Sequence, residues 1–285
     1  MTTKFITSRD NPFFRQLIKL EDSARQRRTA GLTVLDGIHL IGAYHLALGW
    51  PKNLIVSKSG CESTEIKRFL GELGTGAGAD AIVLSDALFR EVSPVKTPTG
   101  IMALISIPPA ASIPMGKDEM GGSFCVLLEA MQDPGNLGSI LRSAAAAGVS
   151  DIYLSDGCAD AWSPKTLRAA MGAHFLLRIH EQSSLADVAR TFSGKIIATT
   201  PQSKTSLYQT RLTGPIAFVF GNEGVGLSDA VLQAASEQVS IPMQGGTESL
   251  NVAAAAAVCF FERVRQGKMG AGCVADETQA DAISD

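Results

Sequence analysis

The sequence predicts an α/β protein of two domains, the second built on a parallel sheet. Its length of 285 residues is about twice that of a usual single domain of roughly 100–200 residues. Short apolar runs alternate with amphipathic stretches along the chain, which is typical of α/β folds. Between the two predicted domains, residues 107–122 hold three prolines and three glycines without apolar periodicity, and residues 108–122 are predicted to form a linker.

The predicted first domain spans residues 1–107. Its strands are expected at 54–57, 81–85 and 100–107, and its helices at 12–20, 38–48 and 64–73. The predicted second domain spans residues 123–267, with strands at 124–129, 151–155, 195–200 and 216–220. These runs are apolar almost throughout, as expected of strands buried on both faces of a parallel sheet.

Helices of the second domain are expected near 137–148, 164–171, 185–192, 228–236 and 250–265. The last segment, residues 268–285, is rich in Ala, Gly and Asp, and it is predicted to be a disordered acidic tail. Because the linker separates two predicted cores, removal of the first domain is expected to leave a folded second one.

Composition excludes several classes of protein. With 45% hydrophobic residues, 19% charged residues and a mean hydropathy of +0.15, the chain is too apolar for an intrinsically disordered protein. Its longest charge-free apolar run, residues 252–261, is about half of the ~20 residues that cross a bilayer. No secretory signal is readable at the N-terminus, so we expect a cytoplasmic protein without membrane association.

Cysteine and histidine spacing argues against a metal or a disulfide framework. The five cysteines include no CxxC pair, and the four histidines show neither HxxxH nor HExxH spacing. Charge is uneven along the chain, with a local balance of +4 over residues 1–28 against a formal net charge of −3 for the whole. This basic leading edge is compatible with a nucleic-acid surface and equally with a solvated helix face.

Three clusters carry candidate chemistry, and the first follows the strand at 124–129. A Pro-Gly turn leads into a helix in which Asn136 is expected as the N-cap and Arg142 lies six residues further on. Ligands of open α/β sheets bind beyond the carboxyl ends of strands, which places this cluster at a site. The alternative is that Asn136 only caps the helix and Arg142 only reaches solvent.

The second cluster follows the most apolar strand and carries Gly221, Glu223, Gly224 and Gly226. Glycines let the backbone approach a ligand closely and expose amide groups. The spacing is not the G-x-G-x-x-G of dinucleotide folds, and a carboxylate in the turn would repel a pyrophosphate. This argues against a nicotinamide-dependent oxidoreductase and favours a cationic or uncharged ligand.

The third cluster runs from Ile241 into an alanine-rich helix. Ser249 is expected as the N-cap, with Asn251 in the first turn, and small residues beside uncovered N–H groups make a polar-edged pocket. An ordinary alanine-rich core helix is the competing interpretation.

Together the clusters resemble the three ordered motifs of the SpoU/TrmH branch of the SPOUT methyltransferases. The matching segments are Asp-Pro-Gly-Asn-Leu-Gly-Ser-Ile-Leu-Arg at 133–142, Phe-Gly-Asn-Glu-Gly-Val-Gly-Leu-Ser at 220–228, Ile-Pro-Met at 241–243 and Ser-Leu-Asn-Val at 249–252. Residues 163–174 also resemble this family, with Ala170 where relatives often have Ser. The N-terminal segments 6–12, 34–37 and 98–101 resemble the family's substrate-binding domain, with Asp36 where relatives usually have Glu.

The resemblance implies transfer of a methyl group from S-adenosyl-L-methionine (AdoMet) to a ribose 2′-hydroxyl of structured RNA. Ribosomal RNA is favoured, with a tRNA 2′-O-methyltransferase or a non-catalytic RNA-binding protein as alternatives. It further implies a trefoil knot in the second domain, a first domain like the ribosomal proteins that bind kinked RNA, and a homodimer formed by the second domain. No metal is expected.

The resemblance also assigns residues to roles. The expected catalytic residues are Asn136, Arg142, Glu223, Ser249 and Asn251. The expected cofactor-binding residues are Thr199, Gly221, Asn222, Gly224, Ile241, Met243 and Leu250. Since a guanidinium is a poor base at neutral pH, we expect Arg142 to bind the adjacent phosphate, while that phosphate or a water accepts the proton.

Overall fold

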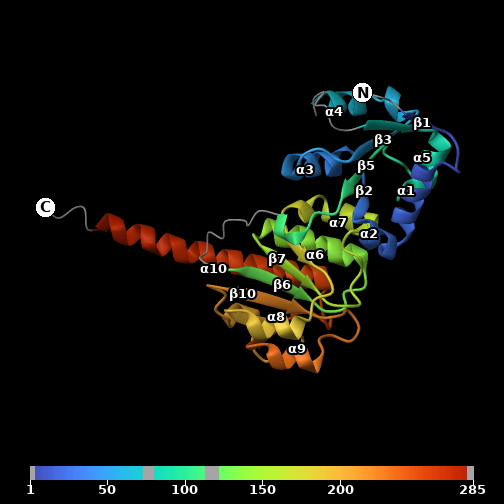
Figure 1. Cartoon of the computed structure of the whole chain (residues 1–285). Helices are drawn as coiled ribbons and strands as arrows, with labels where there is room; N and C mark the ends of the chain where they lie inside the picture. The colour runs from blue at the N-terminus through green and yellow to red at the C-terminus, as the bar shows by residue number, and fades with distance from the viewer. Residues whose placement is uncertain (1–3, 73–79, 113–121, 281–285) are drawn as a thin grey trace. The chain divides into compact units, whose positions relative to one another are not determined.

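The computed structural model describes residues 4–72, 80–112 and 122–280, and the chain forms two compact units (Figure 1). The first comprises Met1–Ile113 and Asp160–Leu176, and the second comprises Pro114–Ala159 and Leu177–Asp285. Most of the predicted linker, residues 113–121, lies outside the described residues.

The first unit is built on a mixed sheet of five strands in the order β1-β4-β3-β5-β2. Strands β1, β4 and β3 are parallel, whereas β5 is antiparallel to both β3 and β2. The strands are β1 (Lys4–Ile6), β2 (Leu32–Asp36), β3 (Asn53–Ser57), β4 (Asp80–Leu84) and β5 (Ile101–Ser106). The helices are α1 (Pro12–Asp22), α2 (Ala24–Ala30), α3 (Ile38–Leu48), α4 (Thr64–Glu72) and α5 (Asp86–Val92).

The core of this unit follows from amphipathic helices on a buried sheet. Helix α1 begins after Asn11, whose side chain accepts from the Phe13 N–H, and Pro12 occupies its first position. Its residues Leu17 and Leu20 pack with Phe89 of α5 in one buried cluster with the sheet. The short elements β1, β2, α2 and α5 were not predicted, because each has at most seven residues and little periodicity.

A segment of the predicted second domain belongs to the first unit. Residues 160–176 carry α7 (Pro164–Ala170) and the 3₁₀ turn Ala173–Phe175. They pack beside β2, where the Thr33 hydroxyl donates to the Trp162 carbonyl oxygen at 2.7 Å. The compact units therefore differ here from a simple division of the chain at residue 123.

The second unit holds a six-stranded sheet in the order β11-β9-β10-β6-β7-β8. Every pair of neighbouring strands is parallel, which confirms the predicted sheet type. The strands are β6 (Phe124–Leu128), β7 (Asp151–Leu154), β8 (Arg178–His180), β9 (Lys195–Thr199), β10 (Ile216–Phe220) and β11 (Glu237–Val239). The two edge strands, β8 and β11, were not predicted, because three residues give no readable pattern.

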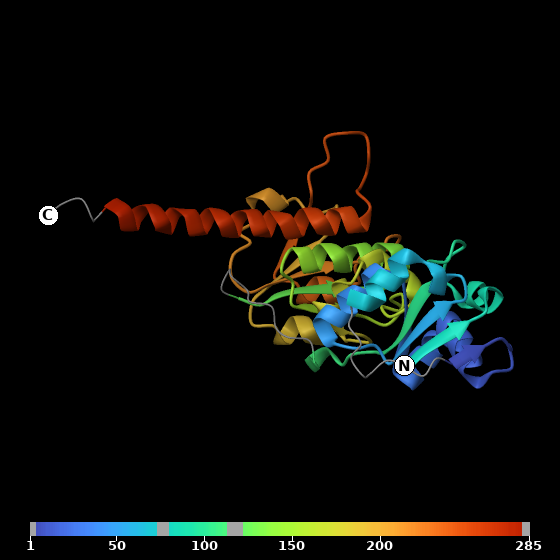
Figure 2. The same ribbon diagram turned by 90° about the horizontal axis from the view of Figure 1, so that it is seen from above.

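Helices cover both faces of this sheet (Figure 1). Helices α8 (Leu185–Thr191) and α9 (Asp229–Ala234) pack on the face that presents Leu127 and Val219. Helices α6 (Pro134–Ala146) and α10 (Val252–Ala280) lie side by side on the other face (Figure 2). There the rings of Phe124, Phe218 and Phe260 form edge-on and tilted contacts, which fill the space between α10 and the sheet.

Helix α10 corrects one expectation from the sequence. It continues to Ala280, whereas residues 268–285 were predicted to be disordered, and residues 281–285 of that segment lie outside the described residues. Alanine, lysine, methionine, glutamate and glutamine in this stretch are strong helix formers. Extending an existing helix also needs no new nucleus, so the helix continues past the core.

Candidate active site

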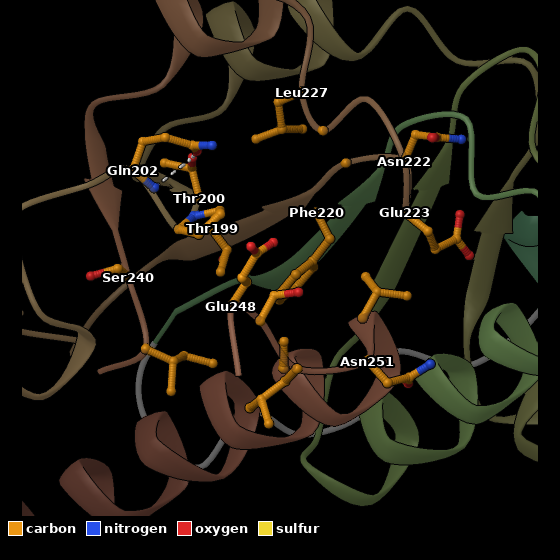
Figure 3. A pocket seen from close by; sticks show the side chains of 18 of the residues that line it. Thr199, Thr200, Gln202, Phe220, Asn222, Glu223, Leu227, Ser240, Glu248 and Asn251 are labelled. Atoms are coloured by element: carbon orange, nitrogen blue, oxygen red, sulfur yellow. Dashed lines mark hydrogen bonds between the residues drawn. The ribbon is translucent and has the colours of Figure 1, made fainter. Parts of the chain in front are cut away.

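A pocket of about 880 Å³ lies at the carboxyl ends of β9 and β10 (Figure 3). This is the edge at which parallel α/β sheets bind ligands. Its walls come from the end of β9, the glycine-rich turn after β10, and residues 240–243 and 248–251 of the segment that leads into α10. Every residue expected to bind the cofactor lines the pocket: Thr199, Gly221, Asn222, Gly224, Ile241, Met243 and Leu250.

The turn after β10 is closed by the backbone itself. Asn222 and Gly226 exchange two backbone hydrogen bonds of 3.0 Å, and the Asn222 side-chain oxygen accepts from the Gly224 and Val225 N–H groups at 2.8 and 3.1 Å. A Cβ on Gly221 would lie 2.3 Å from the Gly226 carbonyl carbon, whereas one on Gly224 would meet only Asn222 Oδ1 at 3.4 Å. The strict requirement for glycine in this turn is therefore at Gly221, whereas Gly224 has room for a Cβ.

A directed chain of hydrogen bonds joins three of the expected catalytic residues. Asn251 Nδ2 donates to Asn136 Oδ1 at 3.0 Å, and Asn136 Nδ2 donates to Glu223 Oε1 at 3.0 Å. The chain links the start of α10, the first turn of α6 and the glycine-rich turn. Its direction is fixed, because Asn251 Oδ1 is already occupied by the Ala253 and Ala254 N–H groups.

These bonds correct the two predicted helix caps. Helix α6 begins at Pro134, and Asp133 is its N-cap, accepting from the Asn136 N–H at 2.7 Å. Asn136 is therefore in the first turn, with its side chain available for Glu223 and Asn251. Asn251, and not Ser249, caps α10, because it alone is adjacent to the first helical residue and accepts from the first-turn N–H groups.

Residues at the end of β6 hold the glycine-rich turn in place, a role that was not predicted from the sequence. Both oxygens of the Glu129 carboxylate accept from Ser228, one from its N–H at 2.8 Å and one from its hydroxyl at 2.6 Å. Asn222 Nδ2 donates to the carbonyl oxygen of Ala130 at 2.8 Å. Ala130 has a φ of 49°, a conformation that a non-glycine residue adopts at a cost. The position of Glu129 directly after a buried strand was the available signal.

Both polar atoms of the Asn222 side chain, Nδ2 and Oδ1, therefore form hydrogen bonds within the protein. Its expected contact with a cofactor is limited to its backbone, while its side chain shapes the turn.

The end of β9 forms another wall of the pocket. Thr199 is its last residue, and the Thr199 hydroxyl lies 4.0 Å from the thiol sulfur of Cys259 on α10. Burial raises the pKa of Cys259 to about 12, so this thiol stays protonated and serves as packing. Beyond it, the Thr200 hydroxyl donates to the Gln202 side chain at the pocket edge (Figure 3).

Of the residues expected to be catalytic, Glu223, Ser249 and Asn251 line the pocket, and Asn136 adjoins them by hydrogen bonds. Arg142 is not among the residues that line it. Its side chain lies on the exposed face of α6, and within the described residues it forms no hydrogen bond or ion pair. Asn136 and Arg142 are six residues apart, which turns them about 120° from one another around the helix.

The described ranges 4–72, 80–112 and 122–280 contain no group of three or more His, Cys, Asp or Glu side chains placed to hold a metal ion. No helix within them is long and apolar enough to cross a membrane.

Comparison with known proteins gives consistent matches. The SpoU rRNA methylase family matches residues 123–261. An uncharacterised tRNA/rRNA methyltransferase of Synechocystis is 34% identical over 267 residues, covering 92% of this chain and 93% of that protein. The 23S rRNA (guanosine-2′-O)-methyltransferase RlmP of Bacillus subtilis is 31% identical and covers 83% of this chain and 90% of its own length.

A solved structure extends the likeness to the fold. The SpoU methyltransferase AviRb of Streptomyces viridochromogenes, in complex with AdoMet, matches with a TM-score of 0.77 and 27% identity. The match covers 90% of this chain and 98% of AviRb.

Proposed function

Because the chain belongs to the SpoU rRNA methylase family, we propose that it transfers the methyl group of AdoMet to a ribose 2′-hydroxyl of structured RNA, with ribosomal RNA favoured over tRNA. The observation that carries the proposal is the pocket at the ends of β9 and β10, which brings the second and third sequence motifs together. The hydrogen bonds of Asn136 to Glu223 and Asn251 add the first motif to the same site.

The pocket fits AdoMet in size and in chemistry. Its volume lies within the ~300–1,000 Å³ typical of sites for ligands of this size. Aliphatic side chains such as Ile241 and Leu250 suit an adenine ring, and the glycine-rich turn brings backbone groups to the pocket wall. Thr199, Gly221, Asn222, Gly224, Ile241, Met243 and Leu250 would hold the cofactor, which supplies an activated methyl group when bound.

The residues of the chain then have two tasks, which are to position the ribose hydroxyl and to stabilise the charge that develops on its oxygen. A ribose hydroxyl is a weak nucleophile, so catalysis consists mainly of holding it in line with the methyl group. Arg142 binds the phosphate next to the target ribose and favours the developing alkoxide, and that phosphate or a water accepts the proton. Asn136, Glu223 and Asn251 hold the walls of the site in a fixed relation through their hydrogen bonds, with Ser249 beside them.

In this proposal the first unit binds and recognises the RNA substrate. A hollow of about 370 Å³ at α1 and α2 is lined by Arg15, Lys19 and the amides of Gln16 and Gln26. Lysine and arginine side chains bind phosphate groups, and amide side chains can form hydrogen bonds with base edges. Arg15 also forms an ion pair with Asp10. The relatives named for 23S rRNA favour ribosomal RNA as the substrate, and a cytoplasmic location is part of the same proposal.

The active form is a homodimer of the second unit, with each site drawing on both chains. Support comes from the exposed position of Arg142 and its absence from the pocket lining of its own chain. The trefoil knot implied by the family resemblance belongs to the same proposal.

The decisive experiment combines binding with methyl transfer. Calorimetry with the purified full chain is expected to show AdoMet binding without added metal. Mapping of 2′-O-methyl groups in RNA from cells with and without the protein then identifies the target. Absence of AdoMet binding by folded protein would refute the proposal, and a missing methyl group in tRNA would move the substrate from ribosomal RNA to tRNA.

A further inference from the structure

The charges that line the pocket are all of one sign. Among its lining residues, Glu223 and Glu248 carry carboxylates, and none is a lysine or an arginine. Neither carboxylate forms an ion pair within the described parts of the chain. A pocket with unpaired carboxylates favours a cation over a neutral ligand of the same shape.

The two carboxylates differ in what holds them. Glu223 accepts a hydrogen bond from Asn136 and lies on the side of the pocket near Asn251 (Figure 3). Glu248 accepts no hydrogen bond from the described residues, and its carboxylate points into the pocket, toward Thr199 and Phe220, from the segment before α10 (Figure 3). Glu248 is thus the carboxylate that the protein leaves available to a ligand.

We propose that Glu248 makes the pocket select the positively charged methyl donor over its neutral demethylated product, S-adenosylhomocysteine. This inference rests on the proposed function. The two molecules share the adenine, the ribose, the ammonium and the carboxylate, and they differ by a methyl group and one unit of charge at sulfur. A contact with the shared groups strengthens both ligands equally, so only contacts with the methyl group or with the sulfonium charge separate them, and a carboxylate acts through the charge. Transfer of the methyl group then removes the attraction and favours release of the product.

The expected size of the effect follows from Coulomb's law. For charges several ångströms apart in a solvent-exposed pocket, one carboxylate gives about a threefold to tenfold preference for the cation. Because exposed charges are screened by salt, the preference should shrink when ionic strength rises from ~0.02 M to ~0.5 M.

Calorimetry on the full chain tests this inference with three ligands. These are AdoMet, S-adenosylhomocysteine, and sinefungin, which carries an amine cation in place of the methylated sulfur. The variants are Glu248→Gln, which removes the charge, and Glu248→Lys, which reverses it. Glu72→Gln is the matched control, because Glu72 is an exposed glutamate at the end of α4, in the other unit. Thermal unfolding verifies that each variant is folded.

The informative quantity is the ratio of the two dissociation constants, product over donor. It is expected to fall about threefold or more in Glu248→Gln, to fall further in Glu248→Lys, and to stay unchanged in Glu72→Gln. Sinefungin should weaken together with AdoMet. An unchanged ratio, or equal weakening of donor and product, would overturn the inference while leaving the proposed function intact. If the wild-type chain bound neither ligand, the proposed function itself would fail.

Discussion

The guanidinium of Arg27 forms a buried ion pair with the carboxylate of Asp160, at 2.7 Å from Nε and 2.6 Å from Nη2 to the same Oδ2 atom. The two residues are 133 positions apart in the sequence, and their side chains are 5% and 10% exposed. Arg27 also donates to the carbonyl oxygens of Leu20 and Glu21. Residues 160–176 lie within the sequence match to the methylase family, but they belong to the first unit of the structure, and this ion pair holds them there.

Loss of one partner of this pair is expected to be costly. Arg27→Met should lower the free energy of unfolding by about 3–5 kcal/mol, because it leaves the Asp160 charge buried and unpaired. Chemical denaturation measures this change. Adding Asp160→Asn to the same variant should recover part of the loss, since it removes the charge while Oδ1 still accepts from the Trp162 N–H. A loss below ~1 kcal/mol would show that the pair is solvated.

The same contacts change the expectation for a truncated protein. From the linker alone, a fragment without the first domain was expected to fold by itself. In the structure, such a fragment would lose the partners of Trp162 and of Asp160. Tests of binding and assembly therefore require the full chain.

A second prediction concerns the pH dependence of stability. Burial raises the pKa of Glu21 to about 7, against the attraction of Arg27, and its Oε2 has no hydrogen-bond partner among the described residues. The folded state therefore holds a proton that the unfolded state releases near pH 4.5. Its contribution to stability is present below pH 4.5 and is lost as pH rises to about 7.

The variant Glu21→Gln removes the loss of stability that Glu21 causes as pH rises. At pH 8 the variant is expected to be more stable than the wild type by roughly 1–3 kcal/mol, with a smaller gain at pH 5. His174 opposes Glu21, because burial lowers its pKa to about 4 and costs stability as pH falls below 6.5. With Glu21 removed, stability should rise with pH between about 4 and 6.5. Equal differences between variant and wild type at pH 5 and pH 8 would contradict the assignment.

A third prediction distinguishes two glycines of the same turn. Gly221→Ala is expected to abolish AdoMet binding, because its Cβ would lie 2.3 Å from the Gly226 carbonyl carbon and would open the turn. Gly224→Ala should retain binding within about threefold, since its Cβ meets only Asn222 Oδ1 at 3.4 Å. Calorimetry with folded variants compares the two. The reverse order of effects would mean that a ligand, and not the turn, sets the requirement.

The sequence predicts the residue types of this site better than it predicts the helix caps and the contacts between distant segments. Gly221, Glu223 and Asn251 were predicted as site residues from the motifs, and all three line the pocket. The caps were wrong, since Asp133 and Asn136 are both good caps and only the backbone decides between them. Residues 160–176 lie inside the family match at 123–261 but belong to the first compact unit, where the buried Arg27–Asp160 pair joins distant parts of the chain. Neither partner shows a local signal of that contact.

A fourth prediction tests the role of Arg142. Arg142→Ala is expected to lower methyl transfer at least ~100-fold, because positioning of the RNA phosphate is lost in the transition state. AdoMet affinity should stay within about twofold, since Arg142 does not line the pocket of its own chain. Arg142→Lys should not restore the rate, because one ammonium cannot replace a planar guanidinium. Full activity of Arg142→Lys would reduce the role of Arg142 to its charge alone.

The last prediction decides whether each active site is shared between two chains. Arg142 lies on the exposed face of α6 and does not line its own pocket, so the proposed dimer would bring it to the pocket of the partner. One chain carries Arg142→Ala and the other carries Gly221→Val, and each variant is inactive as a homodimer. In a shared-site heterodimer, one site collects both lesions and the other is intact. A purified heterodimer should therefore regain about half of wild-type activity. If each site lies within a single chain, both sites stay defective and no activity returns. Light scattering on the full chain supplies the control, because a monomer would exclude sharing whatever the activities.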